Sequence, residues 1–290
     1  MKYNLSDPAT VRSVLSRHGF SFSKALGQNF LIDPDVCPAM ADAAVRSPED
    51  GVLEIGPGIG VLTAELCARA KKIVSVELDR RLLPVLSDTL AEFDNIEIVN
   101  EDVLKLDLHA LLQEKFADCK RVSVCANLPY YITSPVVMKL LEERLPLSQI
   151  VVMVQKEAAE RLCAEVGTRE AGAVTAAVQY YATAETLFGV GRECFVPSPN
   201  VDSAVIRLSV REIPEFQIDD EKFFFRMVKA AFAQRRKTAQ NGISAGLGLP
   251  KEQVAAALEA VGLPQNVRAE KIPMETLSAL SNILLSHQSE

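Results

Sequence analysis

The tetrapeptide Asn127-Leu128-Pro129-Tyr130 is the part of the chain whose residue types point most directly to chemistry. It follows an apolar run at 122–126, which is expected to be a buried strand. The Asn127 amide oxygen and the Leu128 carbonyl could accept hydrogen bonds from an exocyclic amine. Pro129 fixes its own φ and biases Leu128 towards an extended conformation that would aim this carbonyl. Tyr130 could stack on a flat base.

A site with two hydrogen-bond acceptors and a stacking ring suits methylation of an aromatic amine. The lone pair of an amine such as adenine N6 is delocalised into the ring, so the nitrogen is a poor nucleophile. Acceptors that hold its N–H bonds favour a pyramidal nitrogen, which can attack a sulfonium methyl in line, with positioning and electrostatics supplying most of the acceleration. A base held this way lies outside any duplex stack. Phe195 is a candidate second stacking ring, although its surroundings alone favour a core phenylalanine before a turn.

A glycine-rich turn at 54–60 indicates a ligand loop between a strand and a helix. Gly56 and Gly58 would let the backbone turn tightly and approach a ligand closely. The spacing is G-x-G-x-G and not the dinucleotide pattern G-x-G-x-x-G. Taken alone, the turn is equally typical of an ordinary strand-to-helix connection.

Acidic and polar residues at the ends of successive predicted strands favour a nucleoside ligand. Glu77 could accept both ribose hydroxyls, and Asp102 could accept from an adenine amine while Val103 packs on the ring. Asn127 ends the next strand. Each carboxylate alone is more often a solvated loop residue, but open α/β sheets bind ligands at the carboxyl ends of their strands. Several such positions together therefore predict a nucleoside cofactor.

Strand and helix patterns alternate from about residue 36 to 210, which predicts a doubly wound, Rossmann-like α/β sheet. Beyond residue 211 we expect only helices, at 221–233, 251–261 and 273–285. The sequence thus predicts an α/β catalytic domain at 1–210 and a small all-helical domain at 211–290. The strands are expected at 52–55, 72–77, 96–99, 122–126, 150–154, 185–190 and 204–210.

Composition limits the remaining classes of protein. The 290 residues are 48% hydrophobic, enough for a large core, and the net charge of −7 argues mildly against a nucleic-acid partner. A basic cluster at 235–237 offsets this locally. The six cysteines show no C-x-x-C pair and the three histidines no ligand spacing, so we expect reduced thiols and no metal. With no signal-like or membrane-spanning segment, we expect a cytoplasmic protein.

These motifs together resemble those of the ribosomal RNA adenine dimethyltransferase family, and within it the bacterial small-subunit branch. The likeness runs from about residue 20 to 280, and Asn127–Tyr130 alone would leave DNA adenine methyltransferases open. It departs from the family pattern at Asn200, at 167–179 and at 240–242. The segments that carry it are 24–31, 54–60, 127–130, 195–199, 201–205, 231–238 and 268–270.

The resemblance implies S-adenosylmethionine as donor and no metal. The substrate would be two adjacent adenosines in a hairpin near the 3′ end of 16S rRNA, each dimethylated at N6 within an assembling small subunit. The resemblance also implies that Arg235, Arg236 and Lys237 contact rRNA, and a monomer is expected. The donor pocket would use Asn29, Leu31, Gly56, Glu77, Asp102 and Asn127.

Two alternatives stay open on the residues. The first is the related large-subunit rRNA methyltransferase that confers macrolide resistance, disfavoured by the segments 202–204 and 268–270. The second is an RNA-binding assembly factor without catalysis. The intact Asn127–Tyr130 argues against it, since a pure scaffold need not keep an amide and an aromatic ring there.

Overall fold

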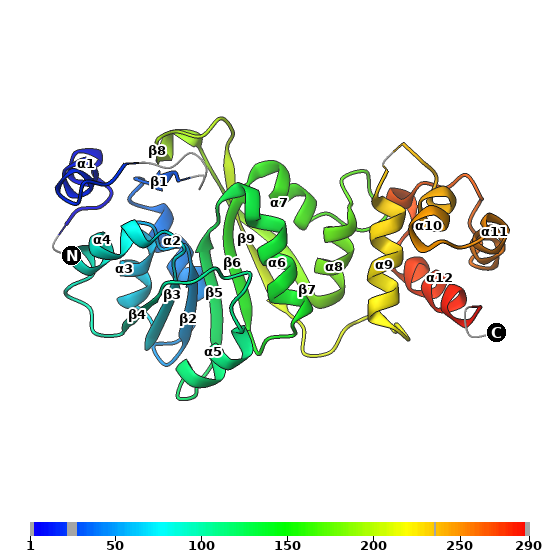
Figure 1. Ribbon diagram of the computed structural model, residues 1–290, viewed down its shortest axis with the longest axis horizontal. Helices are drawn as coiled ribbons and strands as arrows, with labels where there is room; N and C mark the ends of the chain where they lie inside the picture. The colour runs from blue at the N-terminus through cyan, green and yellow to red at the C-terminus, as the bar shows by residue number, and fades with distance from the viewer. Residues whose placement is uncertain (1–2, 22–27, 235, 288–290) are drawn as a thin grey trace. The chain divides into compact units, whose positions relative to one another are not determined.

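The computed structural model describes residues 3–21, 28–234 and 236–287 (Figure 1). The chain divides into two compact units. The first comprises Met1–Ala159 and Ala184–Val210, and the second Glu160–Thr183 and Arg211–Glu290. The sequence placed 160–183 with the catalytic domain, whereas this segment packs with the helical unit.

A seven-stranded sheet forms the centre of the first unit. Its order is β4-β3-β2-β5-β6-β9-β7. The pairs β2–β3, β3–β4, β2–β5 and β5–β6 are parallel, and β6–β9 is antiparallel. The Rossmann-like fold is therefore confirmed. The strands are β2 (Gly51–Ile55), β3 (Lys72–Val76), β4 (Ile96–Val99), β5 (Val122–Asn127), β6 (Gln149–Gln155), β7 (Ala182–Val190) and β9 (Ser203–Val210).

The central strands β2 and β5 are buried except at Asn127, the last residue of β5, as expected when helices cover both faces of a parallel sheet. Helix α2 packs on β5 and β6, and α3 packs on β3. Asp107 caps α5 by accepting a hydrogen bond from the Ala110 amide. The connecting helices are α2 (Val36–Ala44), α3 (Val61–Cys67), α4 (Leu83–Thr89), α5 (Leu108–Lys115), α6 (Thr133–Glu142) and α7 (Lys156–Leu162).

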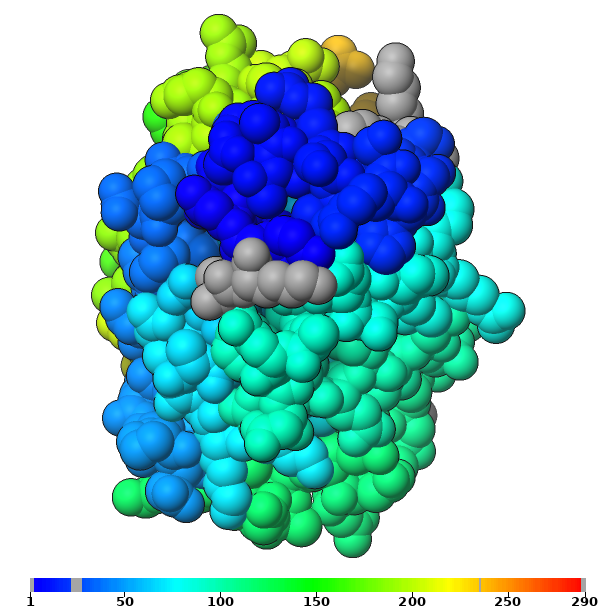
Figure 2. Space-filling view, turned by 90° about the vertical axis from the view of Figure 1, so that its left-hand side faces the viewer, coloured from blue at the N-terminus to red at the C-terminus, as the bar shows by residue number. Residues whose placement is uncertain are grey.

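The N-terminal helix α1 (Pro8–Arg17) lies against α4. Asp88 of α4 accepts a hydrogen bond from the Tyr3 hydroxyl at 3.0 Å and pairs with Arg17 at 3.3 Å. Figure 2 shows this end of the chain, in blue, against the cyan part that includes α4. The helix thus covers one end of the first unit.

A two-stranded ribbon joins distant parts of the first unit. Strand β1 (Phe30–Leu31) pairs antiparallel with β8 (Phe195–Val196), and Leu31 lies opposite Phe195. The Ile32 amide extends the pairing by donating to the Cys194 carbonyl at 2.8 Å. Strands of two residues carry no periodicity, so the sequence did not predict them.

The second unit is helical and contains two helices that the sequence analysis missed, α8 and α10. Helix α10 was missed because Gly242 and Gly246 weaken a helical pattern. Both glycines face α9, where an added Cβ would lie 2.7 Å from the Ala230 carbonyl oxygen or 2.4 Å from the Ala230 Cβ. Close packing therefore explains them. The helices are α8 (Ala173–Tyr181), α9 (Glu221–Phe232), α10 (Ala239–Leu247), α11 (Lys251–Ala260) and α12 (Met274–Ser286).

Candidate functional site

A single pocket in the first unit brings together all the predicted donor and base residues. It lies at the carboxyl ends of β2, β3 and β5 and holds about 1180 Å³ of empty space, including its open mouth. Among its lining residues are Asn29, Leu31, Gly56, Gly58, Glu77, Asp102, Val103, Asn127, Leu128, Tyr130 and Phe195.

The glycine-rich loop after β2 adopts a backbone that only glycine takes readily. Gly56, Gly58 and Gly60 have φ angles of 72°, 60° and 89°. A Cβ at Gly58 would also lie 3.2 Å from the Phe30 ring. The loop can therefore hold its backbone close to a ligand and, at the same time, accept β1 beside it.

Glu77 is a buried carboxylate that faces the pocket from the end of β3. Its Oε1 accepts from the Asp79 amide at 2.7 Å, and its Oε2 accepts from the Gly58 amide at 3.4 Å. Burial raises its pKa, and the two backbone donors oppose that shift. Each carboxylate oxygen has two lone pairs, so both can still accept a ribose hydroxyl.

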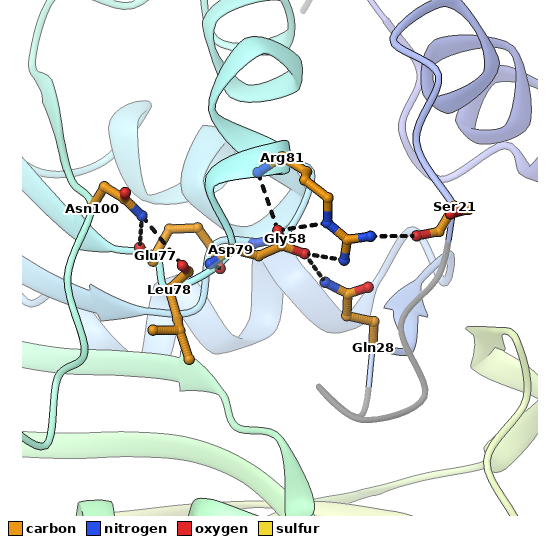
Figure 3. Close-up of polar contacts among 8 residues, drawn as sticks. All are labelled: Ser21, Gln28, Gly58, Glu77, Leu78, Asp79, Arg81 and Asn100. Atoms are coloured by element: carbon orange, nitrogen blue, oxygen red, sulfur yellow. Dashed lines mark hydrogen bonds and ion pairs between the residues drawn. The ribbon is translucent and has the colours of Figure 1, made fainter.

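Asp79 connects the end of β3 to the N-terminal segment, as Figure 3 shows. Its carboxylate accepts hydrogen bonds from Arg81 Nε at 2.9 Å and Arg81 Nη2 at 2.6 Å. It also accepts one from Gln28 Nε2 at 2.8 Å. Hydrogen bonding from Arg81 holds the Asp79 pKa below its ordinary value. Because Gln28 directly precedes Asn29, this carboxylate fixes the residue that leads into the donor pocket. Sequence reasoning assigned Asp79 no role, since a carboxylate two residues after Glu77 reads as an ordinary loop residue.

The loop after β3 is held from the side of β4. Asn100 Nδ2 donates to the Glu77 carbonyl at 2.6 Å and to the Leu78 carbonyl at 3.4 Å (Figure 3). Further along the same connection, Asp102 Oδ1 accepts from the Leu104 amide at 3.0 Å, and Val103 is buried. These contacts set one wall of the pocket, where a flat ring can lie on Val103.

The opposite wall carries the residues predicted to hold the base. Asn127 is the last residue of β5, and Leu128 is buried with its amide donating to the Met153 carbonyl at 3.2 Å. The Tyr130 hydroxyl hydrogen-bonds Ser203 Oγ at 2.8 Å, and burial raises the Tyr130 pKa, so the phenol stays neutral. Phe195 is buried among core residues, as its surroundings in the sequence favour, and it also lines the pocket.

Glu54 lies buried beneath the glycine loop and was not singled out from the sequence. Its Oε2 accepts from Thr63 Oγ1 at 2.8 Å and Ser75 Oγ at 2.5 Å. Its Oε1 has no hydrogen-bond partner among the described residues. Burial raises the Glu54 pKa to about 7. This carboxyl group therefore ties α3 and β3 to β2, and it stays protonated to a higher pH than an exposed glutamate does.

We expect Glu54→Gln to remove a pH-dependent cost to folding. The folded state raises the Glu54 pKa from 4.5 to about 7, so protonation favours folding and the cost grows as pH rises from 4.5 to about 7. Its full size is on the order of 3 kcal/mol. Glutamine keeps an oxygen for Thr63 and Ser75. Urea unfolding at pH 5 and pH 8 should show the variant gaining stability relative to wild type at pH 8.

The matched control is Glu252→Gln, which changes an exposed carboxyl group on α11. Its stability difference from wild type should stay constant between the two pH values. A difference between Glu54→Gln and wild type that is equally constant would contradict the expected protonation of Glu54.

The predicted RNA-contacting residues belong to the second unit, whereas the pocket belongs to the first. Arg236 and Lys237 are exposed in the turn between α9 and α10, and Arg235 lies outside the described residues. Within residues 3–21, 28–234 and 236–287, no cluster of His, Cys, Asp or Glu side chains is arranged to hold a metal ion. None of the helices in those ranges is long and apolar enough to cross a membrane.

The residues of the pocket fit S-adenosylmethionine. Glu77 offers a buried carboxylate for ribose hydroxyls, and the left-handed glycines leave the loop backbone free of side chains. The Asp102–Val103 wall offers an acceptor and an apolar face for an adenine. When bound, this cofactor supplies an electrophilic methyl group on a sulfonium centre.

Comparison with known proteins gives the same assignment. The family described as ribosomal RNA adenine dimethylase matches residues 19–285. Ribosomal RNA small subunit methyltransferase A of Geobacillus thermodenitrificans is 50% identical over 288 residues, covering 98% of both chains. The Bacillus pumilus protein of the same name is 47% identical over 287 residues, again covering 98% of both.

Two solved structures share the fold along most of the chain. The 23S rRNA methyltransferase ErmE is 28% identical with a TM-score of 0.65, covering 88% of this chain and 99% of its own. A dimethyladenosine transferase from Plasmodium falciparum is 25% identical with a TM-score of 0.69, covering 90% and 98%. The chain is thus an S-adenosylmethionine-dependent rRNA adenine dimethyltransferase, and it belongs to the ribosomal RNA adenine dimethylase family.

Proposed function

We propose that the chain dimethylates N6 of two adjacent adenosines in a hairpin near the 3′ end of 16S rRNA. It would do so as a cytoplasmic monomer, within an assembling small ribosomal subunit. The proposal is supported by one observation: the tetrapeptide Asn127–Tyr130 and the predicted donor-binding residues line the same pocket. The choice of the small subunit is supported by 50% identity to small-subunit methyltransferase A, against 28% to ErmE.

Each residue on the donor side of the pocket has a separate role in binding S-adenosylmethionine. Glu77 accepts the ribose hydroxyls, and the backbone of Gly56 and Gly58 lies against the ligand. Asp102 accepts from the adenine amine while Val103 packs on the ring. Asn29 and Leu31, held by the Gln28–Asp79 contact and by the β1–β8 ribbon, close the pocket from the N-terminal side.

On the substrate side, Asn127 and the Leu128 carbonyl accept the two N–H bonds of the target amine. Tyr130 and Phe195 hold the base between them. The proton leaves only after the nitrogen has become alkylated and acidic, so no strong base is needed. After the first transfer, one N–H remains to be held for the second. Arg235, Arg236 and Lys237 contact the phosphate backbone of the rRNA.

The test is an assay of methyl incorporation into purified small and large subunits that lack the modification. We expect incorporation only into small subunits, with mass spectrometry of the digested rRNA showing dimethyladenosine at two adjacent positions. Incorporation only into large subunits would overturn the small-subunit assignment. A monomethylated product would overturn the dimethylation.

A further inference from the structure

Tyr131 is an aromatic residue at the pocket mouth to which the mechanism above gives no task. Its side chain is 55% exposed although it lines the pocket. Its hydroxyl has no hydrogen-bond partner within the described part of the chain. The ring therefore contributes little to the core, and it is free to meet a ligand.

The preceding residue differs sharply. Tyr130 is partly buried and anchored through its hydroxyl to Ser203 on β9. Both residues lie in a 3₁₀ turn, Tyr130–Ile132, which the Ile132 amide closes on the Pro129 carbonyl at 3.1 Å before α6 begins. The neighbours of Tyr131 are thus anchored, and the exposed ring is presented from this turn.

Two of the exposed apolar residues, Tyr131 and Leu78, line this pocket. Five large hydrophobic side chains are exposed among the described residues: Leu78 (52%), Leu104 (36%), Tyr131 (55%), Val201 (44%) and Ile213 (81%). Leu78 also lines the pocket, and Leu104 directly follows the lining residue Val103. Single exposed hydrophobics are ordinary, but a group around a cavity marks a binding surface. Of the five, only Ile213 belongs to the second unit.

We propose that Tyr131 is the stacking platform of a second base subsite, which takes the unpaired nucleobase next to the target adenosine. The inference rests on the proposed function, in which the target adenosine has a second adenosine next to it in the RNA. Moving the target base out of its stack removes one stacking partner from that neighbour. Proteins recognise such splayed RNA bases by stacking them on aromatic side chains.

Stacking makes this subsite tolerant of base identity, because every base has a π-face. The subsite therefore selects for the presence of a base beside the target and not for adenine in particular. While the target adenosine occupies the pocket, its neighbour lies on Tyr131 through both transfers to that target.

The test couples a protein change to an RNA change. Small subunits are reconstituted with rRNA whose 3′ hairpin is a ligated synthetic segment. That segment carries a single adenosine at the target position, with either a guanosine or an abasic ribose as its neighbour. Single-turnover kcat/KM is measured for wild type, Tyr131→Ala and Tyr131→Phe, with donor affinity measured in parallel. Ile213→Ala is the control, since it removes an exposed apolar side chain that belongs to the second unit and does not line the pocket.

With the intact neighbour, Tyr131→Ala should lose about 5-fold to 150-fold in kcat/KM, the value of stacking one base. Its donor affinity should be unchanged, and Tyr131→Phe and Ile213→Ala should match wild type. With the abasic neighbour, wild type should fall to the level of Tyr131→Ala, and the variant should lose nothing more. Equal losses on both RNAs, or no loss on the intact one, would overturn the subsite. Failure of wild type on intact subunits would instead overturn the proposed function.

Discussion

Replacing Asn127 by alanine is expected to slow methyl transfer about 100-fold to 1000-fold, the usual effect of removing one positioned polar group from an active site. The change deletes the acceptor that we propose holds the target amine at the end of β5, and it leaves Leu128 and Tyr130 in place. Binding of the small subunit should stay near the wild-type value, because it depends on many phosphate contacts. Single-turnover transfer at saturating donor measures the chemical step apart from donor affinity.

Asn127→Asp is the informative control for this prediction. It keeps an acceptor oxygen at the same position, so it should retain more activity than Asn127→Ala. If alanine transfers methyl groups as fast as wild type, Asn127 does not hold the amine. If aspartate and alanine are equally slow, the loss does not come from the missing acceptor.

Replacing Glu77 by glutamine is expected to weaken donor binding by about 10-fold to 150-fold, the value of a hydrogen bond to a buried charged group. The side chain is only 6% exposed, so water cannot replace the lost acceptor. Calorimetric titration with S-adenosylmethionine measures the effect directly. Glu252→Gln, on the exposed face of α11, should bind the donor as wild type does.

Donor affinity should also depend on pH through Glu77. In the proposed role the ionised carboxylate accepts both ribose hydroxyls, so donor affinity should be full at high pH and should fall when Glu77 is protonated. Because burial raises the Glu77 pKa, this fall begins at a higher pH than for an exposed glutamate. The same titration repeated from pH 8 to pH 5 should show the fall in wild type and not in Glu77→Gln. Parallel curves for the two proteins would contradict it.

The pocket was predictable from the sequence because one topological rule places its parts. Glu77, Asp102 and Asn127 each follow an apolar strand, and parallel strands end at the same edge of a sheet. Their convergence therefore follows from strand pattern alone. No such rule predicts the position of Phe195, which lies in the pocket because its strand pairs with Leu31.

What the sequence did not reveal depends on contacts between distant residues. The Asp79–Arg81 pair could be guessed from its spacing, but its link to Gln28 crosses 51 positions. Glu54 looks like an ordinary member of the glycine motif until its burial is known. The segment 160–183 follows the α/β pattern in sequence and yet packs with the helices, a choice that tertiary contacts make.

The β1–β8 ribbon has a consequence for the newly synthesised chain. Phe30 and Leu31 emerge early, but their partners Phe195 and Val196 emerge only after the whole parallel sheet has been made. At 5–20 residues per second, that interval is roughly 10 to 30 s. Until it ends, the donor side lacks one strand of its wall. The ribosome-bound chain therefore gains its closed donor pocket only when the first unit is nearly complete.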